Sequence, residues 1–141
     1  MMKKIVSFIF ALLITVSIPF VCPLCVGRAE LPNRYTYVHH ITADLQINAG
    51  TASCYGDGQG KNNDTTTVLI VLLQRRASDS DPWSSYKRWK TTATGTNEAS
   101  ISQSCSVASG YYYRVLTRCQ IKDSGGSVLE TVYQSSPIIW Y

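Results

Sequence analysis

The chain has 141 residues, 45% of them hydrophobic, which is enough for one domain with its own apolar core. Its 13 Lys and Arg against 9 Asp and Glu give a formal net charge of +4. Three basic residues, Lys3, Lys4 and Arg28, lie in the first 29 positions, so the remainder carries 10 basic and 9 acidic side chains, a net charge of +1. Such a domain lacks the global positive charge of nucleic-acid-binding proteins, and we expect no nucleic-acid partner.

The first segment has the features of an export signal. Two lysines precede an apolar run over residues 5–26, and the small-residue pattern at 27–29 offers a cleavage site. The run is nearly long enough to span a bilayer, so an uncleaved anchor facing outside is the alternative, although two prolines disfavour a spanning helix. We therefore expect a cleaved signal peptide over residues 1–29 and a secreted domain over residues 30–141.

Beyond the leader the apolar residues recur with a period of two, which indicates strands, and no window has helical spacing. The alternation begins over residues 41–47 and resumes after a turn at residues 49–50. Residues 56–64, GDGQGKNND, have the composition of a turn, and we expect a mobile loop there. An apolar strand follows over residues 65–74, and a polar loop over residues 77–82.

The clearest strand covers residues 110–122, GYYYRVLTRCQIK. Its odd-numbered positions, from Tyr111 to Ile121, form one face, which we expect in the core, while the even-numbered positions meet water. With this segment the chain has six or seven short strands separated by polar turns. That pattern predicts an all-β protein, an antiparallel β-sandwich.

A turn at residues 123–126 leads into a last strand over residues 128–134. The odd-numbered positions Leu129, Thr131 and Tyr133 are expected to face inward, because Glu130 falls in the other phase. This assignment assumes that a carboxylate avoids the interior of the sandwich.

Three cysteines follow the leader, and three is an odd number. Cys54 and Cys119 fall on the inward phase of their strands, where an immunoglobulin-type bridge would join two sheets, and we predict this disulfide. Cys105–Cys119 and Cys54–Cys105 are the second and third alternatives. The predicted bridge would close a loop of about 65 residues and stabilise the fold by roughly 3–4 kcal/mol. The remaining thiol would be buried or would link two chains.

Residues 68–73, VLIVLL, form an apolar run without alternation. A sandwich strand has one face toward water, so either Val68, Ile70 and Leu72 or the other three residues need a cover. We expect the apolar tail, residues 138–141, to fold back over them, or a second copy of the chain to cover them in an oligomer.

The stretch DPWSSYKRWK, residues 81–90, places two tryptophans and a tyrosine among three basic residues. Trp83 and Trp89 are six residues apart and would share a face of one strand, with Tyr86 opposite. One interpretation is a hairpin strand whose aromatic rings brace the edge of the sandwich. The other is a ligand surface whose rings stack on sugars and whose cations attract an anionic polymer such as teichoic acid or mucin glycan. Its residues would be Trp83, Tyr86, Lys87, Arg88 and Trp89, with Arg75, Arg76 and Lys90 adding positive charge.

No catalytic set is recognisable, and we expect neither an enzyme nor a bound cofactor or metal. The two histidines, His39 and His40, are neighbours on a strand, so their side chains should point to opposite faces and cannot share a metal. Residues 57–64 have the density of a cation-binding loop, but Gln59 and Lys61 stand where a calcium loop needs Asp or Asn.

Several segments together resemble a known family: RYTYVHHITADLQI, GTASC, LQRR, SGYYYRVLTRC and LETVYQSS. In this layout the chain resembles small secreted proteins of Gram-positive, Firmicute-type gut bacteria that form a domain of unknown function. The resemblance implies an exported β-sandwich. A looser similarity, through residues 113–115 and the spacing of Cys54 and Cys119, is to immunoglobulin and fibronectin type III modules. The chain departs from those modules in lacking a tryptophan in TTVLIVLLQ and in carrying Thr117 in place of tyrosine.

The sequence therefore predicts a secreted, immunoglobulin-like, non-catalytic binding module for cell-surface or host glycans and other polyanions. The alternative is a structural or self-associating envelope protein, which rests on residues 68–73 and the odd cysteine. Membrane contact is expected only through an uncleaved leader.

Overall fold

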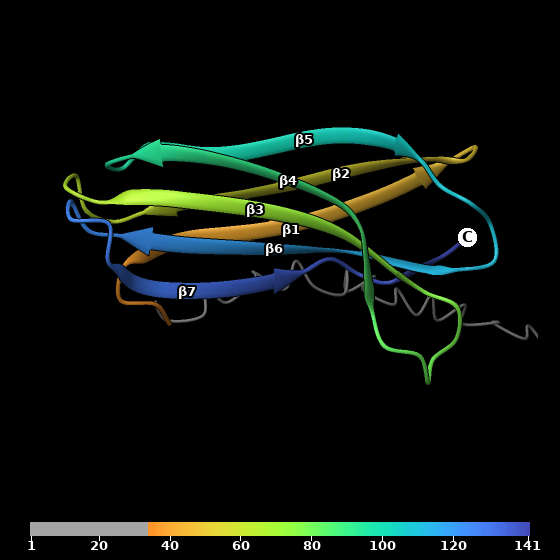
Figure 1. The fold of residues 1–141 in the computed structure, drawn as a ribbon. Coiled ribbons are helices and arrows are strands. Elements are labelled where there is room, and N and C mark those ends of the chain that lie inside the picture. The colour runs from red at the N-terminus through yellow and green to blue at the C-terminus, as the bar shows by residue number, and fades with distance from the viewer. Residues whose placement is uncertain (1–33) are drawn as a thin grey trace, which may run out of the picture. The chain divides into compact units, whose positions relative to one another are not determined.

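The computed structural model describes residues 34–141 (Figure 1). The signal peptide predicted over residues 1–29, with its helix and cleavage site, lies outside the described residues. In the part of the chain that the structure describes, no helix has the length and apolarity needed to cross a membrane.

The described residues form two antiparallel sheets, which confirms the all-β class. One sheet has the strand order β1-β2-β5, and the other has the order β4-β3-β6-β7 with β8 paired to β6. The sequence predicted six or seven strands, and the additional one is the two-residue β8. The strands are β1 (Val38–Asn48), β2 (Thr51–Gly60), β3 (Thr66–Arg76), β4 (Ser84–Thr94), β5 (Glu98–Ser106), β6 (Tyr112–Lys122), β7 (Val128–Ser135) and β8 (Ile139–Trp140).

Both sheets contribute residues to one hydrophobic core. In β6 the buried residues alternate with half-buried ones along the whole strand, and Val115, Cys119 and Ile121 are each 0% exposed. The inward face predicted for this strand is therefore confirmed from Tyr113 onward. The chain passes from one sheet to the other between β2 and β3, between β4 and β5, and between β5 and β6 (Figure 1).

The strand β7 has the opposite phase from the one predicted. Glu130 pairs with the fully buried Ile121, and Val132 joins the core, whereas Tyr133 is 56% exposed. The carboxylate is tolerated on this side because it accepts hydrogen bonds from the backbone N–H groups of residues 36–38, at 3.0, 2.8 and 2.9 Å. A charged residue in the inward phase thus attaches the segment before β1 to β7.

The first part of the predicted loop, residues 56–60, is strand, and the turn is confined to residues 61–64. Residues 56–60 complete β2, and Gly56, Gly58 and Gly60 are its inward positions. A Cβ atom on Gly56 would lie 2.5 Å from Thr117 Oγ1, which is too close for any side chain. The glycines are therefore needed where the two sheets approach each other closely.

The apolar run in β3 is buried on both faces, except for the half-buried Leu72. Leu69, Val71 and Leu73 are each 0% exposed in the core, and Val68 and Ile70 are only 7% and 3% exposed on the outer face. The predicted cover by the C-terminal tail is wrong, because β8 pairs with the first residues of β6. Ile70 instead pairs with Lys90 and Arg118, whose long aliphatic stems flank it on the same face.

Within residues 34–141 the three cysteines are free thiols, and the predicted Cys54–Cys119 bridge is not formed. A Cβ atom on Gly58 would lie 2.9 Å from the Cys119 sulfur, so Gly58 is the residue opposite Cys119 across the core. Cys54 is four residues away along β2, roughly 13 Å, which exceeds the reach of a disulfide. Cys54 and Cys105 are diagonal neighbours on adjacent strands, because Ala52 pairs with Cys105.

We expect Cys105 to react with an alkylating reagent well before the other two thiols. Burial is the main cause that raises the pKa of Cys54 to about 12 and that of Cys119 to about 11, and their exposures are only 1% and 0%. Cys105 is half-buried; burial raises its pKa, while the charge of Lys87 lowers it. Peptide mapping after brief alkylation of the native protein shows the order in which the three thiols react. Equal labelling of all three thiols, or a disulfide-linked peptide pair, would contradict this expectation.

Candidate functional site

The stretch 81–90 divides between the two faces of the larger sheet and does not form one aromatic platform. The register of β4 against β3 shifts by one residue, and Tyr86 is the unpaired residue of the resulting bulge. Because side chains alternate along a strand, one inserted residue reverses the phase of the residues before it. Trp83 and Trp89 therefore lie on opposite faces, and the prediction that they share one is wrong.

Three of the five predicted ligand residues turn toward the core side of β4. Trp89 pairs with the fully buried Val71 and packs against the core. The Tyr86 ring packs edge-on against Tyr113, with ring centroids 6.4 Å apart. The ammonium of Lys87 lies 5.7 Å from the centre of the Tyr86 ring. These contacts support the bracing role for the rings of Tyr86 and Trp89, while Lys87 is exposed.

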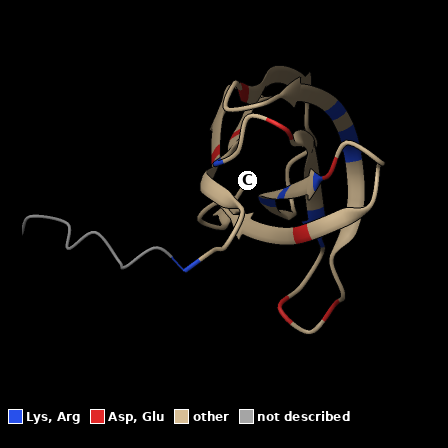
Figure 2. Ribbon diagram, turned by 90° about the vertical axis from the view of Figure 1, so that its left-hand side faces the viewer, with Lys and Arg blue, Asp and Glu red and all other residues tan. Residues whose placement is uncertain are grey.

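The other two, Trp83 and Arg88, lie on the outer face of the larger sheet. This surface, which we call the basic face, carries the cations Arg76, Arg88, Lys90, Arg114 and Arg118. Strands β3, β4 and β6 contain no Asp or Glu, whereas β1, β2 and β5 contain no Lys or Arg. Figure 2 shows closely spaced basic positions along one strand, with acidic positions at the tip of the projecting loop. The domain is thus strongly polarised although its net charge is small.

Two guanidinium groups stack on Trp83 at one end of the basic face. The Cζ atoms of Arg114 and Arg76 lie 4.3 and 4.6 Å from the ring centre. Arg76 also lies 5.5 Å from the ring centre of Tyr112, which packs against Trp140 at 4.6 Å. Burial, and then the charge of Arg76, lowers the pKa of Arg114. Two like charges held this close form a place where a bound anion would be stabilised.

A depression of about 320 Å³ lies further along the basic face. Ile70 and Leu72 form an apolar floor, and the Tyr133 ring is 56% exposed. The Arg118 Nε atom is buried and donates to no acceptor among the described residues. The residues that line the depression are Ile70, Leu72, Ser85, Arg88, Arg118 and Tyr133. Within residues 34–141, Arg76 is the one cation of the basic face that pairs with a carboxylate, and it lies 2.6 Å from Asp79.

Sequence reasoning missed the contributions of β6 and β7 to this surface. Arg114 and Arg118 occupy the even positions of residues 110–122, which were correctly placed toward water, but nothing in the sequence indicates that they lie beside Arg88. The pairing of β6 with β3, and of β3 with β4, brings them together. The one available signal was the fully apolar run of β3, which requires long side chains on its neighbours to cover its outer face.

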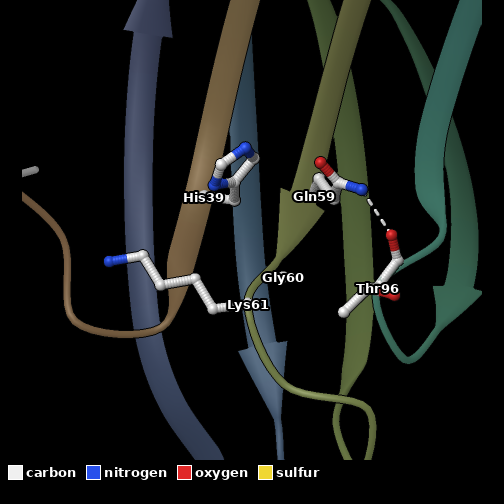
Figure 3. A pocket seen from close by; sticks show the side chains of 5 residues that line it. All are labelled: His39, Gln59, Gly60, Lys61 and Thr96. Carbon is white, nitrogen blue, oxygen red and sulfur yellow. Dashed lines mark hydrogen bonds between the residues drawn. The ribbon is translucent and has the colours of Figure 1, made fainter.

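The two histidine rings lie close together and not on opposite faces as predicted. The register of β1 shifts between Val38 and His40, which makes His39 a bulge residue, and the ring centroids are 5.6 Å apart. His39 lines a depression of about 280 Å³ together with residues of β2 and the turn before β5 (Figure 3). The other lining residues are Gln59, Gly60, Lys61 and Thr96, and Gln59 donates a hydrogen bond to the Thr96 carbonyl.

No family model and no curated protein matches the chain. Among solved structures, the E. coli curli protein CsgC is similar at 9% identity over 68% of this chain and 95% of CsgC, with a TM-score of 0.39. The sporulation control protein Spo0M from Bacillus subtilis is similar at 10% identity over 72% of this chain and 49% of its own, with a TM-score of 0.42. A β-glucosidase from Kluyveromyces marxianus is similar at 9% identity over 72% of this chain and 14% of its own, with a TM-score of 0.41. Likeness at this level carries no inference about function.

Proposed function

We propose that the chain is an exported, non-catalytic binding module for anionic glycans and that the basic face is its ligand surface. The depression between Arg88 and Arg118 carries the proposal. Its apolar floor and the exposed ring of Tyr133 suit one face of a sugar, and guanidinium groups suit a carboxylate or phosphate. Arg118 lines the depression together with Arg88, so its guanidinium can donate hydrogen bonds to such a ligand.

The charge distribution supports a polymeric anion over a single small one. The stack on Trp83 and the depression at Arg88 and Arg118 lie on the same sheet face, so a chain of anionic units can contact both. A face with one sign of charge also attracts such a polymer from a distance, and salt weakens that attraction.

The strand arrangement supports an immunoglobulin-like form of the sandwich. After the β3–β4 hairpin, β5 returns to pair with β2, and β6 then pairs with β3. Sandwiches of this kind commonly present loops and sheet edges to ligands. Self-association through residues 68–73 has less support, since Val68 and Ile70 are only 7% and 3% exposed.

Replacing Arg118 with glutamine is expected to weaken binding to a teichoic acid or a sialylated mucin glycan by about tenfold, the effect of one charge-assisted hydrogen bond. The affinity of the unmodified protein should fall as ionic strength rises. Isothermal titration at two salt concentrations measures both effects, and neutral dextran serves as the uncharged polymer.

Arg34→Gln is the matched control, because it removes the same charge from an exposed residue outside the basic face. It should bind as the unmodified protein does. If Arg34→Gln and Arg118→Gln weakened binding equally, the loss of affinity would follow from the lower net charge alone. That result would contradict a defined site. Binding of dextran as tight as that of the anionic polymers would contradict the role of the cations.

A further inference from the structure

Three side chains from adjacent strands converge on the outer face of the smaller sheet. His40 comes from β1, Asp57 from β2 and Glu98 from β5, and Gln59 pairs with both His40 and Glu98. One donor atom of each residue lies within 4.8 Å of the other two. His40 Nε2 is 3.3 Å from Asp57 Oδ1 and 3.3 Å from Glu98 Oε2.

Asp57 is the unusual member of this cluster. It is only 7% exposed, and its Oδ1 atom accepts no hydrogen bond from any described residue. Its Oδ2 atom accepts a hydrogen bond from the Tyr55 hydroxyl at 2.7 Å. A buried carboxylate oxygen that accepts no hydrogen bond is costly, and a cation held between it, His40 and Glu98 would offset that cost.

Two distances in the cluster, from His40 Nε2 to each carboxylate, match those between the ligands of a zinc ion. Zinc binds imidazole nitrogen at about 2.0–2.1 Å and carboxylate oxygen at about 2.0–2.2 Å, usually in a tetrahedron. Two ligands of such a tetrahedron are about 3.4 Å apart, close to the 3.3 Å from His40 Nε2 to each carboxylate. An imidazole in the set favours a transition metal over calcium, whose ligands are oxygen atoms.

We propose that His40, Asp57 and Glu98 bind a divalent transition metal, with zinc as the best match, at a site separate from the basic face. The Tyr55 hydroxyl orients the Asp57 carboxylate from outside the ligand set. Three protein ligands leave a fourth position for water or for a donor atom of a bound molecule. The depression lined by His39 and Gln59 neighbours the cluster and offers room for such a molecule.

The proposal is tested by titrating zinc into the full chain after chelator treatment, in competition with a chromophoric chelator. We expect one zinc ion per chain and loss of this binding in both Asp57→Asn and Glu98→Gln. Tyr55→Phe should bind about tenfold more weakly, as is typical when a group that orients a ligand is removed. Bound cobalt should give the strong visible absorption of tetrahedral coordination, and calcium should not compete.

Asp44→Asn is the matched control, because it removes an exposed carboxylate from the same face, where Asp44 pairs with Tyr55. If Asp57→Asn fails to fold, Glu98→Gln decides, since the Glu98 side chain is 47% exposed. Zinc held by cysteines would survive Glu98→Gln, so unchanged binding in that variant would overturn the site. Equal loss in Asp44→Asn, preference for calcium, or no zinc binding by the unmodified chain would also overturn it. The last result would leave the two carboxylates with His40 as their partner.

Discussion

Replacing Glu130 with alanine is expected to lower the free energy of unfolding by about 3 kcal/mol, because hydrogen bonds to a charged group are strong and a buried N–H left without a partner is costly. The carboxylate accepts bonds from the backbone N–H groups of residues 36–38, and Val38 is 0% exposed. Loss of the Glu130 carboxylate also frees the segment before β1 from β7. Urea denaturation of the two proteins measures the difference.

The pH dependence of stability provides the control for Glu130. Burial raises the pKa of this carboxyl, but the three backbone bonds and the charge of Lys61 outweigh burial and lower it on balance. A lowered pKa in the folded state gives stability that is present above the unfolded value of about 4.3 and is lost as pH falls through the folded value. Glu130→Gln keeps one acceptor oxygen, so it should lower the free energy of unfolding by less than Glu130→Ala. Because the amide does not titrate, the stability of this variant should lack the part that is lost in acid. A pH profile identical to that of the unmodified protein would contradict the role of the charge.

Gly56→Ala is expected to destabilise the domain by about 3 kcal/mol, through overpacking of the core. The new Cβ would lie 2.5 Å from Thr117 Oγ1 and 2.6 Å from Val71 Cγ2. Both neighbours are β-branched and fully buried, so they cannot rotate away without strain. Thermal or urea denaturation shows the effect as a lower midpoint.

Gly125→Ala is the matched control for Gly56→Ala. Its Cβ would meet only Asp123 Oδ1, at 3.4 Å, in an exposed turn. There the substitution should be neutral or stabilise by up to about 1 kcal/mol, because alanine has less freedom in the unfolded chain. A similar loss in both variants would show that the close approach of the sheets at Gly56 is not the cause.

Part of the candidate site was accessible from the sequence. The concentration of cations in residues 75–90 drew attention to β3 and β4, and the even positions of residues 110–122 were correctly placed in water. The error at residues 81–90 came from counting positions along a regular strand. A bulge at Tyr86 reverses the phase, and bulges depend on how a partner strand is paired, which no local pattern reports.

The absence of the predicted disulfide and the cluster of His40, Asp57 and Glu98 could not be foreseen, for a related reason. Cys54 and Cys119 are both inward, as predicted, but a disulfide depends on which residues lie opposite across the core, and that residue is Gly58. His40, Asp57 and Glu98 are separated by long stretches of chain, and the pairing of β1, β2 and β5 alone brings them together. The glycine-rich composition of β2 concealed both features, because it is typical of a turn.

The sequence by itself determined the all-β class, most strand positions and the inward face of β6, because a period of two is a local consequence of strand geometry. Tertiary structure decided everything that depends on neighbours distant in the chain. It set which glycines the opposite sheet requires, where Glu130 finds its three donors, which cations gather on one face and which three side chains converge at Asp57. The physical reason is that close packing and satisfied hydrogen bonds between sheets outweigh the composition of any single strand.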